Sequence, residues 1–340
     1  MKAVQIQRYS KNIDPVLREI SIPKIGDTEV LVRVKAAAVN PVELLIATGS
    51  VRLIQDYSMP LTLGNECSGV VEQVGASVTE FQVGEAVYAR LPVRTLGGFA
   101  EYVSVPQSTL AKMPAGCDFA AVAAIPLTGL TAWQCLTEEL EAKAGETVLI
   151  PGGSGSFGEM AVPLAKALGL HVTVSGNARV QERFLALGAD QYLNYRKENY
   201  WEVLPPVDYV IDTLGAGELN QELSVLKPGG RLVSLRMGPN RAFAAKKQFP
   251  AWKRLLFSLA GARYDSAARK QGKEYRFLFV REDGAQLRTI TKIVEHNGIT
   301  PRIDPHVFTL EIARDALQLV AEGHPDGKVI LQISQGGIGK

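Results

Sequence analysis

The chain has 340 residues, with 37 Lys and Arg against 35 Asp and Glu, a formal net charge of +2 and a hydrophobic fraction of 46%. This length is typical of two domains and is sufficient to bury a core without disulfides or metal staples. The ordinary hydrophobicity and near-neutral charge exclude a disordered tail protein and argue against a dedicated nucleic-acid binder.

Three scattered cysteines form neither a disulfide framework nor a CxxC metal knuckle, and they fit a reducing compartment. The N-terminal residues carry no apolar core of signal-peptide length. The longest apolar stretch, residues 119–133, is interrupted by Pro126 and is too short to span a membrane. We therefore expect a cytoplasmic protein without an integral membrane segment.

The first 115 or so residues predict a β-rich domain. Residues 29–38 alternate apolar and polar side chains, as a half-buried strand does. Further strands are predicted over residues 68–74, 86–89 and 99–105, between glycines and prolines. Short strands with this punctuation favour a small barrel or sandwich.

From about residue 147 onward, strands alternate with helices. Strands are predicted at 147–150, 171–175, 191–193, 209–212 and 231–235, and helices at 159–168, 180–187 and 219–226. This alternation predicts a doubly wound parallel sheet, so the fold class is α/β. We expect one domain over residues 1–124 and 276–340, to which a helix at 286–295 and a strand at 328–333 contribute. Residues 125–275 form the second domain.

A glycine-rich loop follows the strand at 147–150 and opens the next helix. Gly153, Gly155 and Gly158 satisfy the G-x-G-x-x-G pattern in the strand–loop–helix context that a dinucleotide site requires. Glycines let backbone N–H groups approach a pyrophosphate, and the helix N-terminus adds a positive dipole end. The alternative is a glycine-rich turn without a ligand. The residues predicted to bind the cofactor here are Gly152, Gly153, Ser154, Gly155, Ser156, Phe157 and Gly158.

The choice of dinucleotide is predicted at the end of the strand over residues 171–175. An NAD-binding chain places a carboxylate there for the ribose 2′-hydroxyl. This chain has Ser175, Asn177 and Arg179 instead, and an arginine can pair with the 2′-phosphate of NADPH. These three residues are therefore predicted to bind NADPH. The alternative is that Arg179 begins a solvated helix.

Short motifs in a fixed order now point to a family. They are residues 40–43 (NPVE), 64–66 (GNE), 69–71 (GVV), 83–87 (VGEAV), 98–102 (GFAEY), 129–132 (GLTA), 187–190 (LGAD), 226–230 (LKPGG) and 327–329 (GKV). Over essentially its whole length the chain resembles the zinc-free quinone oxidoreductase branch of the medium-chain dehydrogenase/reductase family. Within that branch, residues 275–280 and the ending resemble the enone and alkenal reductases.

The resemblance implies a GroES-like β-rich substrate domain and a Rossmann cofactor domain, with the active site in the cleft between them. It implies hydride transfer from the nicotinamide, and a homodimer formed through the edge of the cofactor domain's sheet.

Zinc is argued against by two residues. Zinc dehydrogenases of this family carry a Cys and a His at the places of Asn40 and Asn65, and neutral amides are poor zinc ligands. Without a Lewis acid, alcohol oxidation is disfavoured, whereas an activated C=C bond or a quinone mainly needs alignment. We therefore predict a small-molecule acceptor: a quinone or an α,β-unsaturated ketone or aldehyde.

By resemblance, the catalytic residues are Asn40, Tyr57 and Thr128. Asn40 and Thr128 would lie near the nicotinamide. Tyr57 would donate a hydrogen bond to the developing oxyanion, although solvent could supply the proton instead. The alternative for Tyr57 is an aromatic in the pocket wall or on the surface.

Further cofactor contacts are implied at other positions. Tyr195 matches a tyrosine at the adenosine phosphate end, with a strand-end aromatic as the alternative. Leu214 and Gly215 follow a strand's carboxyl end, where open α/β sheets bind ligands. Phe279 and Lys328 are carried over from the family as cofactor contacts.

Residues 241–273 form a basic segment in which nine Lys and Arg stand against Asp265 alone, so its charge is +8 and the rest of the chain is −6. Trp252, Leu255, Leu256 and Leu259 follow the i, i+3, i+4, i+7 spacing of an amphipathic helix. We favour a lid helix whose apolar face covers the cleft while its charges face water. The alternative is surface contact with an anionic membrane.

Two other functions stay open at this point. The first is an enoyl-thioester reductase, whose carrier would meet the basic segment. The second is a non-catalytic NADPH-binding protein that acts as a sensor or structural component.

Overall fold

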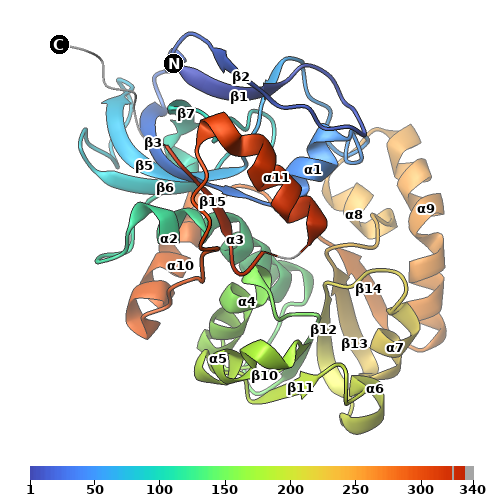
Figure 1. Cartoon of the computed structure of the whole chain (residues 1–340). Coiled ribbons are helices and arrows are strands. Elements are labelled where there is room, and N and C mark those ends of the chain that lie inside the picture. Colours follow the sequence, from blue (N-terminus) through green and yellow to red (C-terminus); the bar gives the residue numbers. More distant parts are fainter. Residues whose placement is uncertain (324, 334–340) are drawn as a thin grey trace. The chain divides into compact units, whose positions relative to one another are not determined.

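The computed structural model describes residues 1–323 and 325–333. The chain divides into two compact units (Figure 1). Unit 1 combines Met1–Leu130 with Arg281–Lys340, and unit 2 is Thr131–Val280. Each unit is described by itself.

Unit 1 is built on two sheets. One has the antiparallel order β2-β1-β4, and the other has the order β15-β3-β5-β6-β8, with β7 also pairing with β3. The long strand β3 (Glu29–Val39) is buried along most of its length, because α2 packs against it. The other strands are β1 (Lys2–Ile6), β2 (Val16–Glu19), β4 (Leu61–Thr62), β5 (Glu66–Val74), β6 (Ala86–Arg90), β7 (Tyr102–Pro106), β8 (Leu110–Lys112) and β15 (Val329–Gln332).

Helices complete unit 1. The Asp118 carboxylate caps α2 by accepting a hydrogen bond from the Ala121 amide at 2.7 Å. Asp283 caps α10 in the same way, and Gly298 ends it in the left-handed conformation. The helices are α1 (Pro41–Ala47), η1 (Gln107–Thr109), α2 (Phe119–Ala123), α3 (Pro126–Gln134, which runs into unit 2), α10 (Gly284–Asn297), η4 (Leu310–Ile312) and α11 (Ala313–Glu322).

Residues Phe119–Glu139 have the length and apolarity of a membrane span. However, they are divided among α2, α3 and a π-helical turn, η2 (Cys135–Glu139), and 72% of the most apolar window is buried within the structure. This stretch therefore packs as a core segment.

Unit 2 contains a parallel six-stranded sheet with the order β11-β10-β9-β12-β13-β14. Numbered from β9, this is the order 3-2-1-4-5-6 of a dinucleotide-binding sheet, which confirms the predicted doubly wound fold class. The strands are β9 (Thr147–Pro151), β10 (His171–Gly176), β11 (Gln191–Asn194), β12 (Val207–Asp212), β13 (Leu226–Ser234) and β14 (Glu274–Phe277).

The helices of unit 2 connect these strands. α4 (Ser156–Ala167) contains Pro163 and nevertheless begins directly at the glycine loop. The others are η3 (Ala178–Val180), α5 (Gln181–Ala186), α6 (Tyr200–Val203), α7 (Leu219–Ser224), α8 (Arg241–Lys246) and α9 (Ala251–Lys270). The predicted helix over residues 219–226 is two residues too long, because β13 already begins at Leu226. The predicted strand over 99–105 is likewise wrong at its start, since β7 begins at Tyr102.

Candidate active site and cofactor loop

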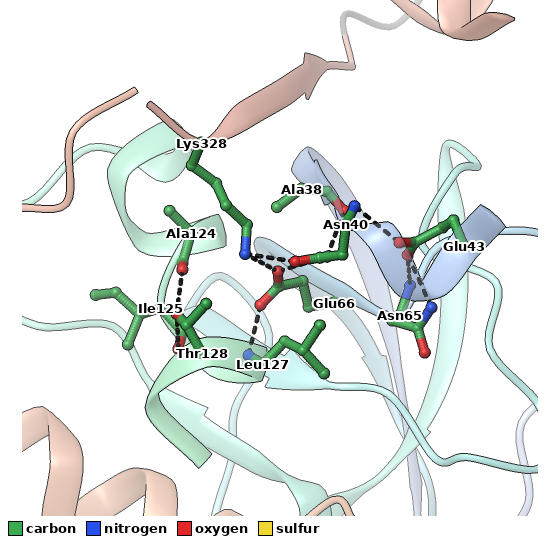
Figure 2. Close-up of polar contacts among 10 residues, drawn as sticks. All are labelled: Ala38, Asn40, Glu43, Asn65, Glu66, Ala124, Ile125, Leu127, Thr128 and Lys328. Carbon is green, nitrogen blue, oxygen red and sulfur yellow. Dashed lines mark hydrogen bonds and ion pairs between the residues drawn. The ribbon is translucent and has the colours of Figure 1, made fainter. Parts of the chain in front are cut away.

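The centre of unit 1 holds a buried ammonium group. The Lys328 Nζ donates to the Asn40 Oδ1 at 2.6 Å and forms an ion pair with the Glu66 Oε1 at 2.9 Å. The Asn40 Nδ2 donates to the same Glu66 oxygen at 2.9 Å, so the three side chains form a closed triangle (Figure 2). Lys328 is 4% exposed, and Glu66 is completely buried.

Glu66 also fixes the first turn of α3. Its Oε2 accepts a hydrogen bond from the Leu127 amide at 2.6 Å. The Thr128 hydroxyl, one residue further on, donates to the Ala124 carbonyl at 3.0 Å. Glu66 therefore brings two of the predicted residues, Asn40 and Thr128, into one rigid constellation with Lys328 (Figure 2).

A second carboxylate, Glu43 in the first turn of α1, supports this constellation. The Glu43 Oε2 accepts from the Asn40 amide at 2.8 Å, and its Oε1 accepts from the Asn65 amide and side chain at 3.0 and 2.8 Å. Burial raises the pKa of Glu43 to about 7, although these hydrogen bonds oppose the shift. The Asn65 Oδ1 in turn accepts from the Arg90 Nη2 at 3.2 Å, and burial lowers the pKa of this arginine. We call Asn40, Glu43, Asn65, Glu66, Arg90 and Lys328 the buried ion network.

Tyr57 presents a different situation. Its ring lies in the core of unit 1 and is 7% exposed, and among the described residues its hydroxyl has no hydrogen-bond partner. Burial raises the pKa of Tyr57 above its ordinary value, opposed by the positive charge of Arg90. The phenol therefore stays protonated at neutral pH and has an unused proton.

The glycine loop of unit 2 has the geometry of a phosphate cradle. A Cβ on Gly158 would lie 1.7 Å from the Gly153 carbonyl oxygen, so the loop can close against α4 only with glycine there. A Cβ on Gly155 would meet nothing within 4 Å, so this side of the loop is open. Gly155 caps α4 without a side-chain hydrogen bond, which leaves first-turn N–H groups for a ligand.

The end of β10 lies beside this loop. Ser175 is buried, whereas Arg179 is exposed, and no carboxylate pairs with it in the described part of the chain. The Asn177 side chain accepts from the Arg179 amide at 3.1 Å. Tyr192, which the sequence analysis did not single out, donates its hydroxyl proton to the Asn177 carbonyl at 2.7 Å and thereby holds this turn.

The end of β12 is fixed by a buried aspartate. The Asp212 Oδ1 accepts from the Leu214 and Gly215 amides, both at 2.7 Å, and its Oδ2 accepts from the Ser234 hydroxyl at 2.5 Å. Leu214 is 44% exposed at the carboxyl end of the sheet, where such sheets bind their ligands.

The remaining predicted cofactor contacts are Tyr195, Phe279 and Lys328. Tyr195 follows β11, is 52% exposed, and accepts a hydrogen bond from the Arg196 Nε at 3.2 Å. Phe279 is half-buried in the segment after β14. Lys328, predicted as a cofactor contact, makes two contacts through its ammonium group, to Asn40 and Glu66, and its role toward the cofactor stays a prediction.

Two family models and several known proteins are similar to this chain. An alcohol dehydrogenase GroES-like domain model matches residues 26–115, and a zinc-binding dehydrogenase model matches residues 187–331. The human quinone oxidoreductase is 33% identical over 245 residues, which are 68% of this chain and 72% of that protein. The chain belongs to the medium-chain dehydrogenase/reductase family.

Other members of this family extend the similarity. The chloroplastic NADPH-dependent alkenal/one oxidoreductase of Arabidopsis thaliana is 29% identical over 321 residues, 92% of this chain and 74% of that one. The solved quinone oxidoreductase of Coxiella burnetii superposes with a TM-score of 0.81 at 27% identity, covering 98% of this chain and 99% of that chain. The expected GroES-like and Rossmann domains are thereby confirmed.

The name of one matching family model raises the question of zinc, which the side chains of this family member do not fit. Among residues 1–323 and 325–333, no group of three or more His, Cys, Asp or Glu side chains is placed to hold a metal ion. The Asn40 and Glu66 oxygens are bound to the Lys328 ammonium, and a dication among them would face that positive charge. By contrast, the open glycine loop and the α4 N-terminus fit a dinucleotide.

Proposed function

We propose that this protein is an oxidoreductase that uses NADPH and no zinc, and reduces a quinone or the C=C bond of an α,β-unsaturated ketone or aldehyde. The names of its relatives support the quinone and alkenal/one classes. The observation that carries the proposal is the Lys328 ammonium held between Glu66 and Asn40, the residue that stands where the resemblance implies a cysteine in the zinc dehydrogenases of the family.

NADPH, when bound, supplies a hydride. Residues of unit 2 hold and orient it: the backbone of the Gly153–Gly158 loop at the pyrophosphate, and the Arg179 guanidinium at the 2′-phosphate. Asp212 holds the Leu214–Gly215 turn in place through two backbone hydrogen bonds. Serine, asparagine and arginine at the end of β10, rather than a carboxylate, favour the phosphorylated dinucleotide.

Residues of unit 1 prepare the acceptor. The Lys328 ammonium is held in a water-poor setting, where its field acts on a carbonyl that gains electron density. Glu66 fixes the positions of Lys328, of Asn40 and of the α3 turn that carries Thr128. These side chains are fixed before the reaction, so little reorganisation is needed during it.

Tyr57 is the proposed proton donor. Its hydroxyl is protonated at neutral pH because burial raises its pKa, and it has no partner among the described residues. It would donate to the oxygen on which negative charge develops. Solvent is the competing proton donor. Loss of the Tyr57 hydroxyl should slow turnover if Tyr57 is the donor, and should leave turnover unchanged if solvent is.

The test is a panel of acceptors with the purified protein: 1,4-benzoquinone, an enal, a 2-enoyl thioester and buffer alone, each with NADPH and with NADH. We expect turnover with the first two and a preference for NADPH. Preference for the thioester would support the enoyl-thioester reductase. Tight NADPH binding without turnover of any acceptor would support the sensor and refute the enzyme.

A single substitution tests the preference for NADPH over NADH. Arg179→Ala should raise the dissociation constant for NADPH about tenfold to a hundredfold and leave that for NADH unchanged, because only NADPH carries the 2′-phosphate. Lys143→Ala is the matched control, since Lys143 is also an exposed cation of unit 2 but lies outside the cofactor loops. An equal loss for both dinucleotides would overturn the assignment of Arg179.

A further inference from the structure

Helix α9 has two apolar faces. Phe257, Gly261, Tyr264 and Ala268 are buried within unit 2. The remaining large apolar side chains are exposed: Trp252 by 59%, Leu255 by 62%, Leu256 by 39% and Leu259 by 68%. With about 100° of rotation per residue, these four side chains are centred on the side of the helix opposite the buried face. We call them the apolar stripe.

The four side chains of the apolar stripe stay between 39% and 68% exposed, so they are not part of the packing face of α9 within unit 2. The expected lid over the cleft stays a prediction. Periodicity predicted the amphipathic pattern, but a different set of side chains supplies the packing face. Contiguous exposed apolar side chains on a soluble protein usually mark an interaction site. Tryptophan beside leucines is typical of helices that lie in a membrane interface.

Cations border the apolar stripe. Arg263, one turn after Leu259 on the same side of α9, is exposed, and the Lys253 ammonium lies 5.5 Å from the centroid of the Trp252 ring. Further along α9, a cavity of about 510 Å³ is lined by Arg241, Arg269, Lys273 and Arg276 as well as by Asp265 and Glu274. The segment from 241 to 273 carries +8, whereas the rest of the chain carries −6.

We propose that α9 docks unit 2 on an anionic lipid bilayer, with the apolar stripe in the headgroup region and the bordering cations on lipid phosphates. The charge distribution orients the molecule, because the anionic surface attracts this segment and repels the remainder of the chain. A second copy of this chain is the poorer occupant. An interface with two-fold symmetry that placed the stripe on itself would bring two +8 segments together. The proposal does not depend on the reaction of the protein.

The experiment is co-sedimentation of the full chain with vesicles of phosphatidylcholine alone and of phosphatidylcholine with phosphatidylglycerol, at low and high salt. We expect binding to the anionic vesicles only, weakened by salt, with a blue shift of tryptophan emission that Trp252→Phe removes. Leu255→Ser/Leu259→Ser should lower the affinity for anionic vesicles at least about tenfold. Arg263→Glu should lower it about tenfold at low salt.

Matched controls separate the stripe from general surface properties. Leu185→Ser/Val203→Ser removes two exposed aliphatic side chains of the same unit, and Lys143→Glu reverses an exposed charge; both should bind like the wild type. Absence of vesicle binding, or binding that the stripe variant does not change, would overturn the proposal. So would a stripe variant that turns a dimer into a monomer in sedimentation velocity without lipid, because the occupant would then be a second copy.

Discussion

The ion pair between Lys328 and Glu66 should be a main determinant of the stability of unit 1. Lys328→Met removes the ammonium group and keeps the apolar stem. The Glu66 carboxylate is completely buried, and among the described residues it then retains only the Asn40 side-chain amide and the Leu127 backbone amide as donors. A buried charge without its counter-charge is costly because it has lost its hydration.

The expected magnitude follows from these contacts. Breaking a buried pair by removing one partner costs about 3–5 kcal/mol, and the two remaining donors place Lys328→Met near the lower end, about 3 kcal/mol. Glu66→Gln should cost a similar amount, since it leaves the ammonium with the Asn40 oxygen. The double variant Glu66→Gln/Lys328→Met carries no buried charge at this place, so it should cost less than the sum of the two, with a coupling of about 2 kcal/mol.

Urea unfolding followed by far-UV circular dichroism measures these values. Lys112→Met is the matched control, because its ammonium also pairs with a glutamate of unit 1, Glu85, but both side chains reach solvent. An exposed pair of this kind contributes less than about 1 kcal/mol. If Lys328→Met costs no more than Lys112→Met, or if the double variant equals the sum of the single ones, the reasoning about the buried pair is refuted.

Three further predictions concern the same sites. The Glu43 pKa of about 7 lies above the value of about 4.3 for an unfolded glutamate, so the folded state binds more protons between these pH values. Stability therefore falls as pH rises through this window, by up to about 4 kcal/mol. Denaturation from pH 4.5 to 8 should show a smaller decline in Glu43→Gln, and an unchanged slope would contradict the shift. Tyr57→Phe should lower kcat about a hundredfold and leave NADPH binding unchanged. The variant should unfold no more easily than the wild type, because it deletes a buried hydroxyl that has no partner among the described residues. A wild-type kcat would assign the proton to solvent. Gly158→Ala should lower Tm and abolish NADPH binding, because the added methyl group would meet the Gly153 carbonyl. Gly155→Ala should keep Tm and weaken NADPH binding about tenfold, since its methyl group meets no protein atom. Equal losses of Tm in the two variants would contradict this explanation.

The parts of the molecule that the sequence predicted are those with a local signature. The glycine loop is recognisable because close backbone contacts exclude every side chain at Gly153 and Gly158, and those glycines stand in one short stretch of chain. The alternation of apolar strands and helices likewise predicts the parallel sheet of unit 2.

The buried ion network could not be predicted in this way. Asn40 and Lys328 are 288 residues apart, and pattern analysis within one stretch of chain contains no information on which distant charges meet. Glu66 and Glu43 stand in motifs that the resemblance identified, yet their role as acceptors depends on the pairing of β3 with β5 and with β15. Tyr192 is missed for the same reason, because it holds the turn at Asn177, which lies 15 residues earlier in the sequence. Asp212 is a different case, since the Leu214 and Gly215 amides that donate to it follow directly in the sequence.

The Lys328 ammonium and a zinc ion would activate a substrate oxygen in different ways, and this difference narrows the class of acceptor that we propose. A bound zinc ion offers an open coordination position to a substrate oxygen, and therefore activates an alcohol or a carbonyl by direct coordination. An ammonium group has no such position, and two of its contacts are already made to Asn40 and Glu66. It can stabilise a developing negative charge through its field, but it cannot make a weak electrophile reactive or lower the pKa of an alcohol as zinc does. We therefore expect the acceptor to bring its own electrophilicity, as a quinone or a conjugated carbonyl does, and a simple ketone or alcohol to turn over much more slowly.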